Sequence, residues 1–125
     1  MKKESREAEI KALVEQIVKG LQEIKGKQIV SLDLRKIDNA VSDYFVIASG
    51  DSNTHVEALA GSVEEFVKKE LKDKPWHVEG TSNAEWVLMD YVNVVVHIFQ
   101  REPRELYNIE GLWADAVSKE YDELA

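Results

Sequence analysis

The sequence predicts a single α/β domain, in which a mixed sheet of about five strands is flanked by helices. Two stretches with a helical period enclose two short apolar stretches of strand length, and a later apolar region carries the polar interruption of a hairpin. Strands separated by a helix can pair in parallel, whereas a hairpin pairs antiparallel, so both arrangements are expected in one sheet. The 125 residues are the length of one typical domain, which we place at 1–125.

The first half of the chain predicts a helix and two strands. Apolar residues recur every three or four positions from about Arg6 to Lys25, and Gly26 is a typical residue at a helix end. Residues 28–34 alternate around Val30 and predict a strand, with a loop at 36–39. Tyr44 to Ser49 is almost entirely apolar, as expected for a central strand buried on both faces.

A second helix is expected to begin within residues 51–54 and to run to Leu71. Several residues there are good N-caps, and Thr54 with Glu57 has the spacing of a capping box. The helical period continues to a basic end, and Pro75 then breaks the chain.

The second half predicts three strands and a terminal helical region. A short strand at 76–79 and a loop at 80–83 precede the apolar region 86–99. That region is too polar at Asp90 and Asn93 to be one strand, so we expect a hairpin that turns at 90–93. Short helices follow from Pro103, and residues 1–5 and 119–125 are expected to be flexible ends.

Composition excludes several classes of protein. The chain has no Cys, so it can form neither a disulfide framework nor a zinc site that depends on Cys. With 24 acidic and 16 basic residues its net charge is -8, which argues against a DNA-binding surface and suits a basic protein partner better. No apolar stretch approaches the length of about 18 residues that spans a membrane, so we expect a cytoplasmic protein without membrane contact.

Candidates for catalysis are sparse. The three His residues lie on different predicted elements, so no metal or cofactor is expected, and His97 is interpreted as a half-buried, hydrogen-bonded side chain. The loop at Gly50, before a helix, could hold a phosphate, but nucleotidyl transfer would also need paired carboxylates, and the hairpin offers only Asp90. We therefore expect no enzyme and keep a nucleotidyltransferase-like activity at the Gly50 loop as an alternative.

Aromatic residues gather in the second half of the chain, interleaved with charged residues. This pattern is typical of a protein–protein interface, although large aromatic side chains also fill cores. We expect Phe99 and Trp113 in the core, whereas Trp86 and Tyr91 fit a core or an interface equally well.

Four segments, in this order, resemble the ribosomal silencing factor family, also called the Iojap-like family. They are Asp43–Ser52, Glu79–Gly80 with Ala84–Tyr91, Val94–Phe99 and Arg104–Trp113. The resemblance implies a mixed sheet with a topology related to nucleotidyltransferases but without their activity. It also implies binding to the large ribosomal subunit through ribosomal protein L-fourteen. That contact would block small-subunit joining and lower translation when nutrients are short, with RNA contact at most peripheral.

By position, the resemblance also implies which residues form the contact. The expected partner-binding residues are Trp86, Leu88, Asp90 and Tyr91. Further residues match family motifs, with roles that are supporting or structural: Glu79, Gly80, His97, Arg104, Tyr107, Glu110 and Trp113.

The hairpin turn departs from the family pattern. Val92 stands where the family usually has Gly, and Asn93 where it usually has an acidic residue. Because Val is disfavoured at positive φ, the turn is expected to be rearranged or shifted. A third class stays open beside the silencing factor and the enzyme: a homodimeric module that pairs through an edge strand or exposed aromatics.

Overall fold

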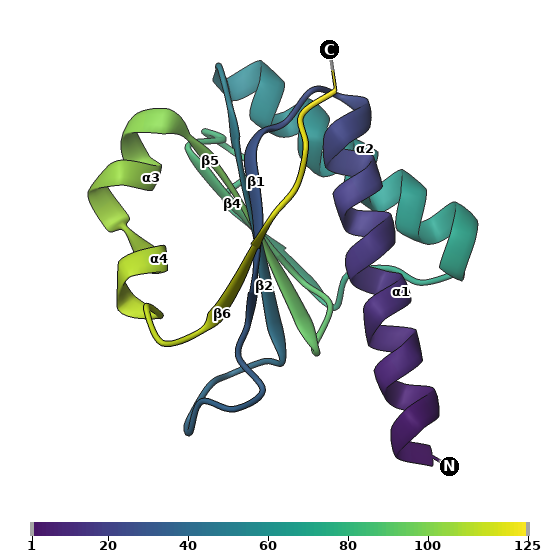
Figure 1. The fold of residues 1–125 in the computed structure, drawn as a ribbon. Helices are drawn as coiled ribbons and strands as arrows, with labels where there is room; N and C mark the ends of the chain where they lie inside the picture. The colour runs from purple at the N-terminus through teal and green to yellow at the C-terminus, as the bar shows by residue number, and fades with distance from the viewer. Residues whose placement is uncertain (1, 125) are drawn as a thin grey trace.

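The computed structural model describes residues 2–124; Met1 and Ala125 lie outside the described residues. The chain alternates helices and strands in one three-layer α/β unit (Figure 1). In chain order the elements are α1 (Lys2–Glu23), β1 (Lys27–Asp33), β2 (Tyr44–Gly50), α2 (Asn53–Leu71), β3 (His77–Glu79), β4 (Trp86–Asp90), β5 (Val94–Gln100), α3 (Arg101–Tyr107), α4 (Ile109–Leu112) and β6 (Val117–Glu120).

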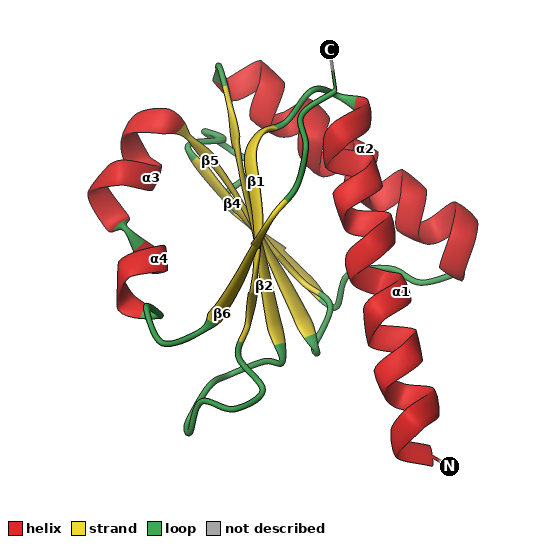
Figure 2. Cartoon of the chain, viewed as in Figure 1, coloured by secondary structure: helices red, strands yellow, loops and turns green. Residues whose placement is uncertain are grey.

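The sheet is mixed, as predicted, and it contains six strands in the order β3-β4-β5-β2-β1-β6 (Figure 2). Its parallel pair is the central one, β2 with β5, in which Tyr44 lies opposite Val94 and Gly50 opposite Gln100. The other four pairs are antiparallel, and β4 with β5 forms the expected hairpin. The order explains why β2 and β5 are buried along nearly their whole length.

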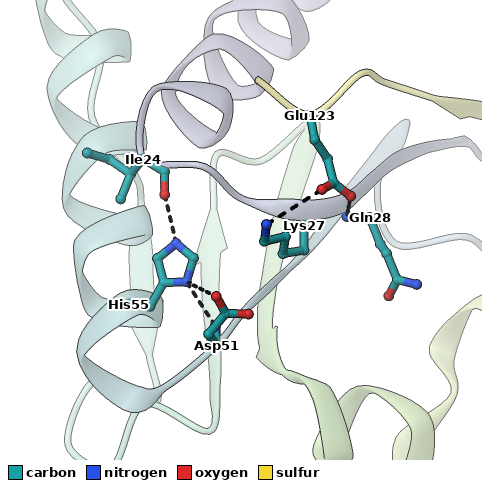
Figure 3. A network of polar contacts seen from close by, with 6 residues as sticks. All are labelled: Ile24, Lys27, Gln28, Asp51, His55 and Glu123. Atoms are coloured by element: carbon teal, nitrogen blue, oxygen red, sulfur yellow. Dashed lines mark hydrogen bonds and ion pairs between the residues drawn. The ribbon is translucent and has the colours of Figure 1, made fainter. Parts of the chain in front are cut away.

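The sixth strand corrects the expectation of a flexible C-terminal end. Val117–Glu120 pairs antiparallel with β1, and beyond it the Tyr121 amide donates to the Ile29 carbonyl at 2.9 Å. The Glu123 carboxylate then contacts Lys27 and accepts from the Gln28 amide at 3.0 Å (Figure 3). All four residues of β6 are exposed, so the strand lacks the apolar alternation by which strands are recognised. The N-terminal end also differs, because α1 begins at Lys2 instead of near Arg6.

Helices cover the two faces of the sheet unequally. The long helices α1 and α2 pack together on one face, over a core that includes Ile17, Leu59 and Met89. The short helices α3 and α4 lie against the opposite face, which we call the second face, over a smaller core around Phe45 and Phe99. Because α3 and α4 are short, part of the second face is left only half-buried at β4.

The long helices end in local caps: α1 stops at Glu23, two residues before its predicted end, whereas α2 starts within the predicted residues and ends at Leu71 as predicted. Lys25, at φ +59°, takes the left-handed position after α1, and the Gly26 amide bonds to the Leu21 carbonyl at 2.8 Å, as in a Schellman motif. At the start of α2 the N-cap is Ser52, whose hydroxyl accepts from the His55 amide at 3.1 Å. The predicted capping box of Thr54 and Glu57 is therefore wrong, because Thr54 already lies inside the helix.

The hairpin turns at the predicted residues, and it does not keep Val92 out of the positive-φ region. Val92 takes the positive φ itself, +76°, and its side chain is exposed. The Val92 amide donates to Oδ1 of Asp90 at 2.7 Å, and the Asn93 amide donates to the Tyr91 carbonyl at 3.0 Å. These bonds hold the turn in a conformation that a β-branched residue rarely adopts.

Candidate functional site

An aromatic cluster occupies the second face of the sheet beside α3 and α4. The Trp86 ring stacks on Phe99 with centroids 4.8 Å apart, and the Tyr107 ring of α3 also lies 4.8 Å from the Trp86 ring, in a tilted arrangement. Phe45 contacts Trp113 edge to face at 5.9 Å. Phe99 is buried, as predicted, and Trp113 packs partly buried against the same core. The cluster gives Trp86 a defined orientation and leaves the residue half-buried.

His97 fixes the indole of Trp86 by a hydrogen bond. The indole Nε1–H donates to Nδ1 of His97 at 3.1 Å, and because indole is only a donor, His97 accepts with Nδ1 and carries its proton on Nε2. Burial lowers the pKa of His97 to about 4, so the ring is neutral near pH 7. The interpretation of His97 as hydrogen-bonded is confirmed, although it is buried instead of half-buried.

Three of the four expected partner-binding residues share one face of β4. Trp86, Leu88 and Asp90 alternate with the core residues Val87 and Met89, so all three lie on the second face and stay partly exposed. We call these three residues the interface stripe.

Tyr91 lies apart from the stripe. Its side chain is buried in the core under α1 and α2, and burial raises the pKa of its phenol above the usual range. Its hydroxyl has no hydrogen-bond partner among the described residues. Tyr91 is therefore not exposed for a partner in this structure.

Two motif residues, Glu79 and Gly80, lie next to the interface stripe. Gly80, at φ +86°, lies so close to the Trp86 carbonyl oxygen that a Cβ would overlap it, which explains why Gly occupies this position before β4. Glu79 lies opposite Leu88 on the neighbouring strand and pairs with His77 at 3.0 Å. The carboxylate of Glu79 thus lies beside the stripe, and that of Asp90 ends it.

Arg104 fastens α3 and α4 to the end of β2. Its guanidinium is buried; Nε donates to Oε1 of Glu110 at 2.8 Å, and Nη1 donates to the Ser49 hydroxyl at 2.8 Å. A second hydrogen bond, from Nη2 to Oε2 of Glu110, makes the pair bidentate. Sequence reasoning listed Arg104 and Glu110 as motif residues but missed Ser49 as their partner, because only the fold brings position 49 beside position 104.

The Gly50 loop, the site of the alternative activity, is occupied by contacts within the chain. The Asp51 amide donates to Nδ1 of His55 at 2.8 Å, and Nε2 of His55 lies 2.7 Å from the Ile24 carbonyl oxygen (Figure 3). Asp90 lies at the opposite end of the sheet, because it pairs with Val95 whereas Gly50 pairs with Gln100. Asp90 and the Gly50 loop therefore cannot act on one small substrate, and within residues 2–124 no three His, Asp or Glu gather as metal ligands.

The comparisons with known proteins decide the family. A family model described as "Ribosomal silencing factor during starvation" matches residues 7–125. The chain belongs to this family. Membership in the ribosomal silencing factor family makes it a ribosome-associated regulator of translation, in agreement with the resemblance seen in its sequence.

Individual relatives agree along most of the chain. Ribosomal silencing factor RsfS from Chromobacterium violaceum is 39% identical over 105 residues, which is 84% of each chain. RsfS from Halalkalibacterium halodurans is 34% identical and covers 88% of this chain and 92% of its own. A crystal structure of a protein from C. violaceum superimposes with a TM-score of 0.79 at 38% identity, covering 84% of this chain and 86% of that one. No helix within residues 2–124 combines the length and apolar character needed to cross a membrane.

Proposed function

We propose that this ribosomal silencing factor acts in the cytoplasm by binding ribosomal protein L-fourteen on the large ribosomal subunit. The interface stripe carries the proposal, because Trp86 and Leu88 offer half-exposed apolar surface beside the carboxylates of Glu79 and Asp90. An apolar centre with an acidic border suits a basic protein surface.

The proposed mechanism is steric: the factor occupies the docking surface of the small subunit and catalyses no reaction. A factor bound where the small subunit docks prevents joining for as long as it stays bound, so no catalytic group or cofactor is needed. The rigid mounting of Trp86 supports this role, because a side chain already held by Phe99 and His97 loses little conformational entropy on binding.

Co-sedimentation with separated ribosomal subunits tests the proposal. We expect the protein to migrate with the large subunit alone and to reduce the formation of joined ribosomes when the small subunit is added. Asp90→Lys should weaken binding by at least about tenfold, because it places a cation against a basic surface. Glu9→Lys is the matched control, since it makes the same charge reversal at an exposed position on α1.

Two outcomes would contradict the proposal. One is migration with neither subunit at low and physiological salt. The other is equal binding by Asp90→Lys and Glu9→Lys, with circular dichroism showing both variants folded.

Self-association of the free protein stays a separate hypothesis. The outer edge of β6 has no strand beside it within residues 2–124, so its backbone groups could pair with a second copy. Light scattering of the free protein across a concentration series measures this directly, and a constant monomer mass would reject it.

A further inference from the structure

A second exposed apolar surface lies at the hairpin turn, beyond the end of the interface stripe. Val41, Trp76 and Val92 are 77%, 81% and 58% exposed, and they line one hollow together with Asp90 and Val95. We call this surface the tip hollow. Trp76 is placed there because its amide donates to the Asp90 carbonyl at 2.7 Å.

The tip hollow contains one residue, Val92, whose backbone conformation is strained in the free protein. Val92 holds a φ of +76°, which is unfavourable for a β-branched side chain, and its exposure means that burial does not offset this strain. Glycine would adopt the same turn without strain. An exposed side chain at such a position is explained if it gains its contacts in a complex.

The tip hollow is continuous with the interface stripe through Asp90. Asp90 is the last residue of the stripe and also lines the hollow, and Val95, its cross-strand partner, borders both. Within residues 2–124, the hydrogen bonds of the Asp90 carboxylate use Oδ1 alone. A partner seated over Leu88 and Asp90 therefore meets Val92 and Trp76 next.

We propose that the tip hollow is the second half of the ribosomal contact. It receives an apolar side chain of a basic partner protein, while the free oxygen of Asp90 binds an adjacent Lys or Arg. This proposal rests on the proposed function and adds to it Trp76 and Val92, which the sequence had not assigned to the contact. A protein partner fits better than RNA, because aliphatic Val41 and Val92 do not stack on bases and a carboxylate repels phosphate.

The experiment distinguishes a role in binding from a role in stability, because Val92→Gly should change the affinity and the melting temperature in opposite senses. Val92→Gly should raise the melting temperature, because it removes the strain, and should weaken affinity for the large subunit about three- to tenfold, because it removes apolar contact. Trp76→Ala should weaken affinity by at least about tenfold and leave the melting temperature unchanged.

Matched controls lie at the far end of the sheet. Lys25→Gly also replaces an exposed residue at positive φ, so it should raise the melting temperature without changing affinity. Leu124→Ala removes an exposed apolar side chain away from the hairpin and should change neither quantity. Affinity is measured with fluorescently labelled protein, for the intact large subunit, for isolated ribosomal protein L-fourteen and for protein-free large-subunit RNA.

The outcomes distinguish this proposal from the one on which it rests. If the wild-type protein does not bind the large subunit, the proposed function fails. If it binds and Asp90→Lys weakens binding while either Val92→Gly or Trp76→Ala binds like wild type, the tip hollow alone is rejected. A loss confined to protein-free RNA, or a change only in the mass of the free protein, also overturns it.

Discussion

At the scale of single residues, the hydrogen bond between Trp86 and His97 depends on the charge of the imidazole. Nδ1 accepts the indole proton only while His97 is neutral, and burial keeps it neutral by lowering its pKa to about 4. A protonated ring would carry hydrogen on both nitrogens and lose this acceptor. The orientation of Trp86 is thus tied to a group that the fold keeps uncharged.

This arrangement predicts a pH dependence of stability. The folded pKa of His97, about 4, lies below the unfolded value of about 6.5, so the unfolded chain binds the proton more readily. The stabilisation is fully present above about pH 6.5 and is lost as the pH falls towards 4, to a total of about 3 kcal/mol. Urea unfolding between pH 7.5 and 4.5 measures it. His97→Gln should unfold with a smaller pH slope, and an equal slope in both proteins would contradict the prediction.

Substitution by Ala should change the free energy of unfolding in opposite directions at Gly80 and Gly61. Gly80→Ala should cost at least about 2 kcal/mol of the free energy of unfolding, because its Cβ would overlap the Trp86 carbonyl at a positive φ. Gly61 lies in α2 with open space around it, so Gly61→Ala should stabilise by about 0.5–1 kcal/mol. Thermal and urea unfolding of both variants checks the sign, and a stable Gly80→Ala protein would be incompatible with this turn.

The alternation of side chains along a strand predicts the face of the sheet on which Tyr91 lies. Positions 86, 88 and 90 face one side of β4, so position 91 continues the opposite set with Val87 and Met89. The resemblance placed Tyr91 with the contact residues by its position in the matching segment Ala84–Tyr91. Adjacent residues of a strand point to opposite faces, and the structure follows that rule.

At the scale of elements, two substitutions at the start of α2 test which residue caps the helix. Ser52→Ala should cost about 1 kcal/mol, because it leaves the His55 amide without the hydroxyl that accepts its hydrogen bond. Thr54→Ala should change stability by less than about 0.5 kcal/mol, since Thr54 is inside the helix and exposed. Denaturant midpoints of the two variants decide, and a larger loss in Thr54→Ala would restore the capping box.

The elements that the sequence predicted are those that carry their own periodic pattern. The apolar stripes of α1 and α2, the apolar run of β2 and the polar break of the hairpin all have local causes. β6 has none, because its four exposed residues are held by pairing with β1, about ninety positions earlier. The contact of Ser49 with Arg104 and the exposure of Val41 and Trp76 also depend on long-range packing, which no local pattern encodes.

At the scale of the whole molecule, the layers leave the proposed contact surface on one side of the sheet. α1 and α2 close one face of the sheet, α3 and α4 close part of the other, and the interface stripe and tip hollow lie in the remainder. The sequence predicted this α/β architecture and the strand that carries Trp86, Leu88 and Asp90. The half-covered second face became visible only in three dimensions.

Occupancy predicts a quantitative link between binding and inhibition. If the factor acts only by covering the docking surface, the fraction of large subunits unable to join equals the fraction occupied. Titrating the protein before adding the small subunit should therefore give half-inhibition near the dissociation constant measured without it. Inhibition at occupancies far below one factor per subunit would show that another mechanism operates.

The parallel pairing of β2 with β5 has a consequence for how the chain is made. Tyr44 lies opposite Val94, fifty positions later, so the centre of the sheet cannot close during synthesis until β5 has left the exit tunnel. Until then β2, which is apolar on both faces, has no neighbour on one side. This protein therefore most needs protection from aggregation while only its first half has been synthesised. The elements able to form at that stage are α1 and α2.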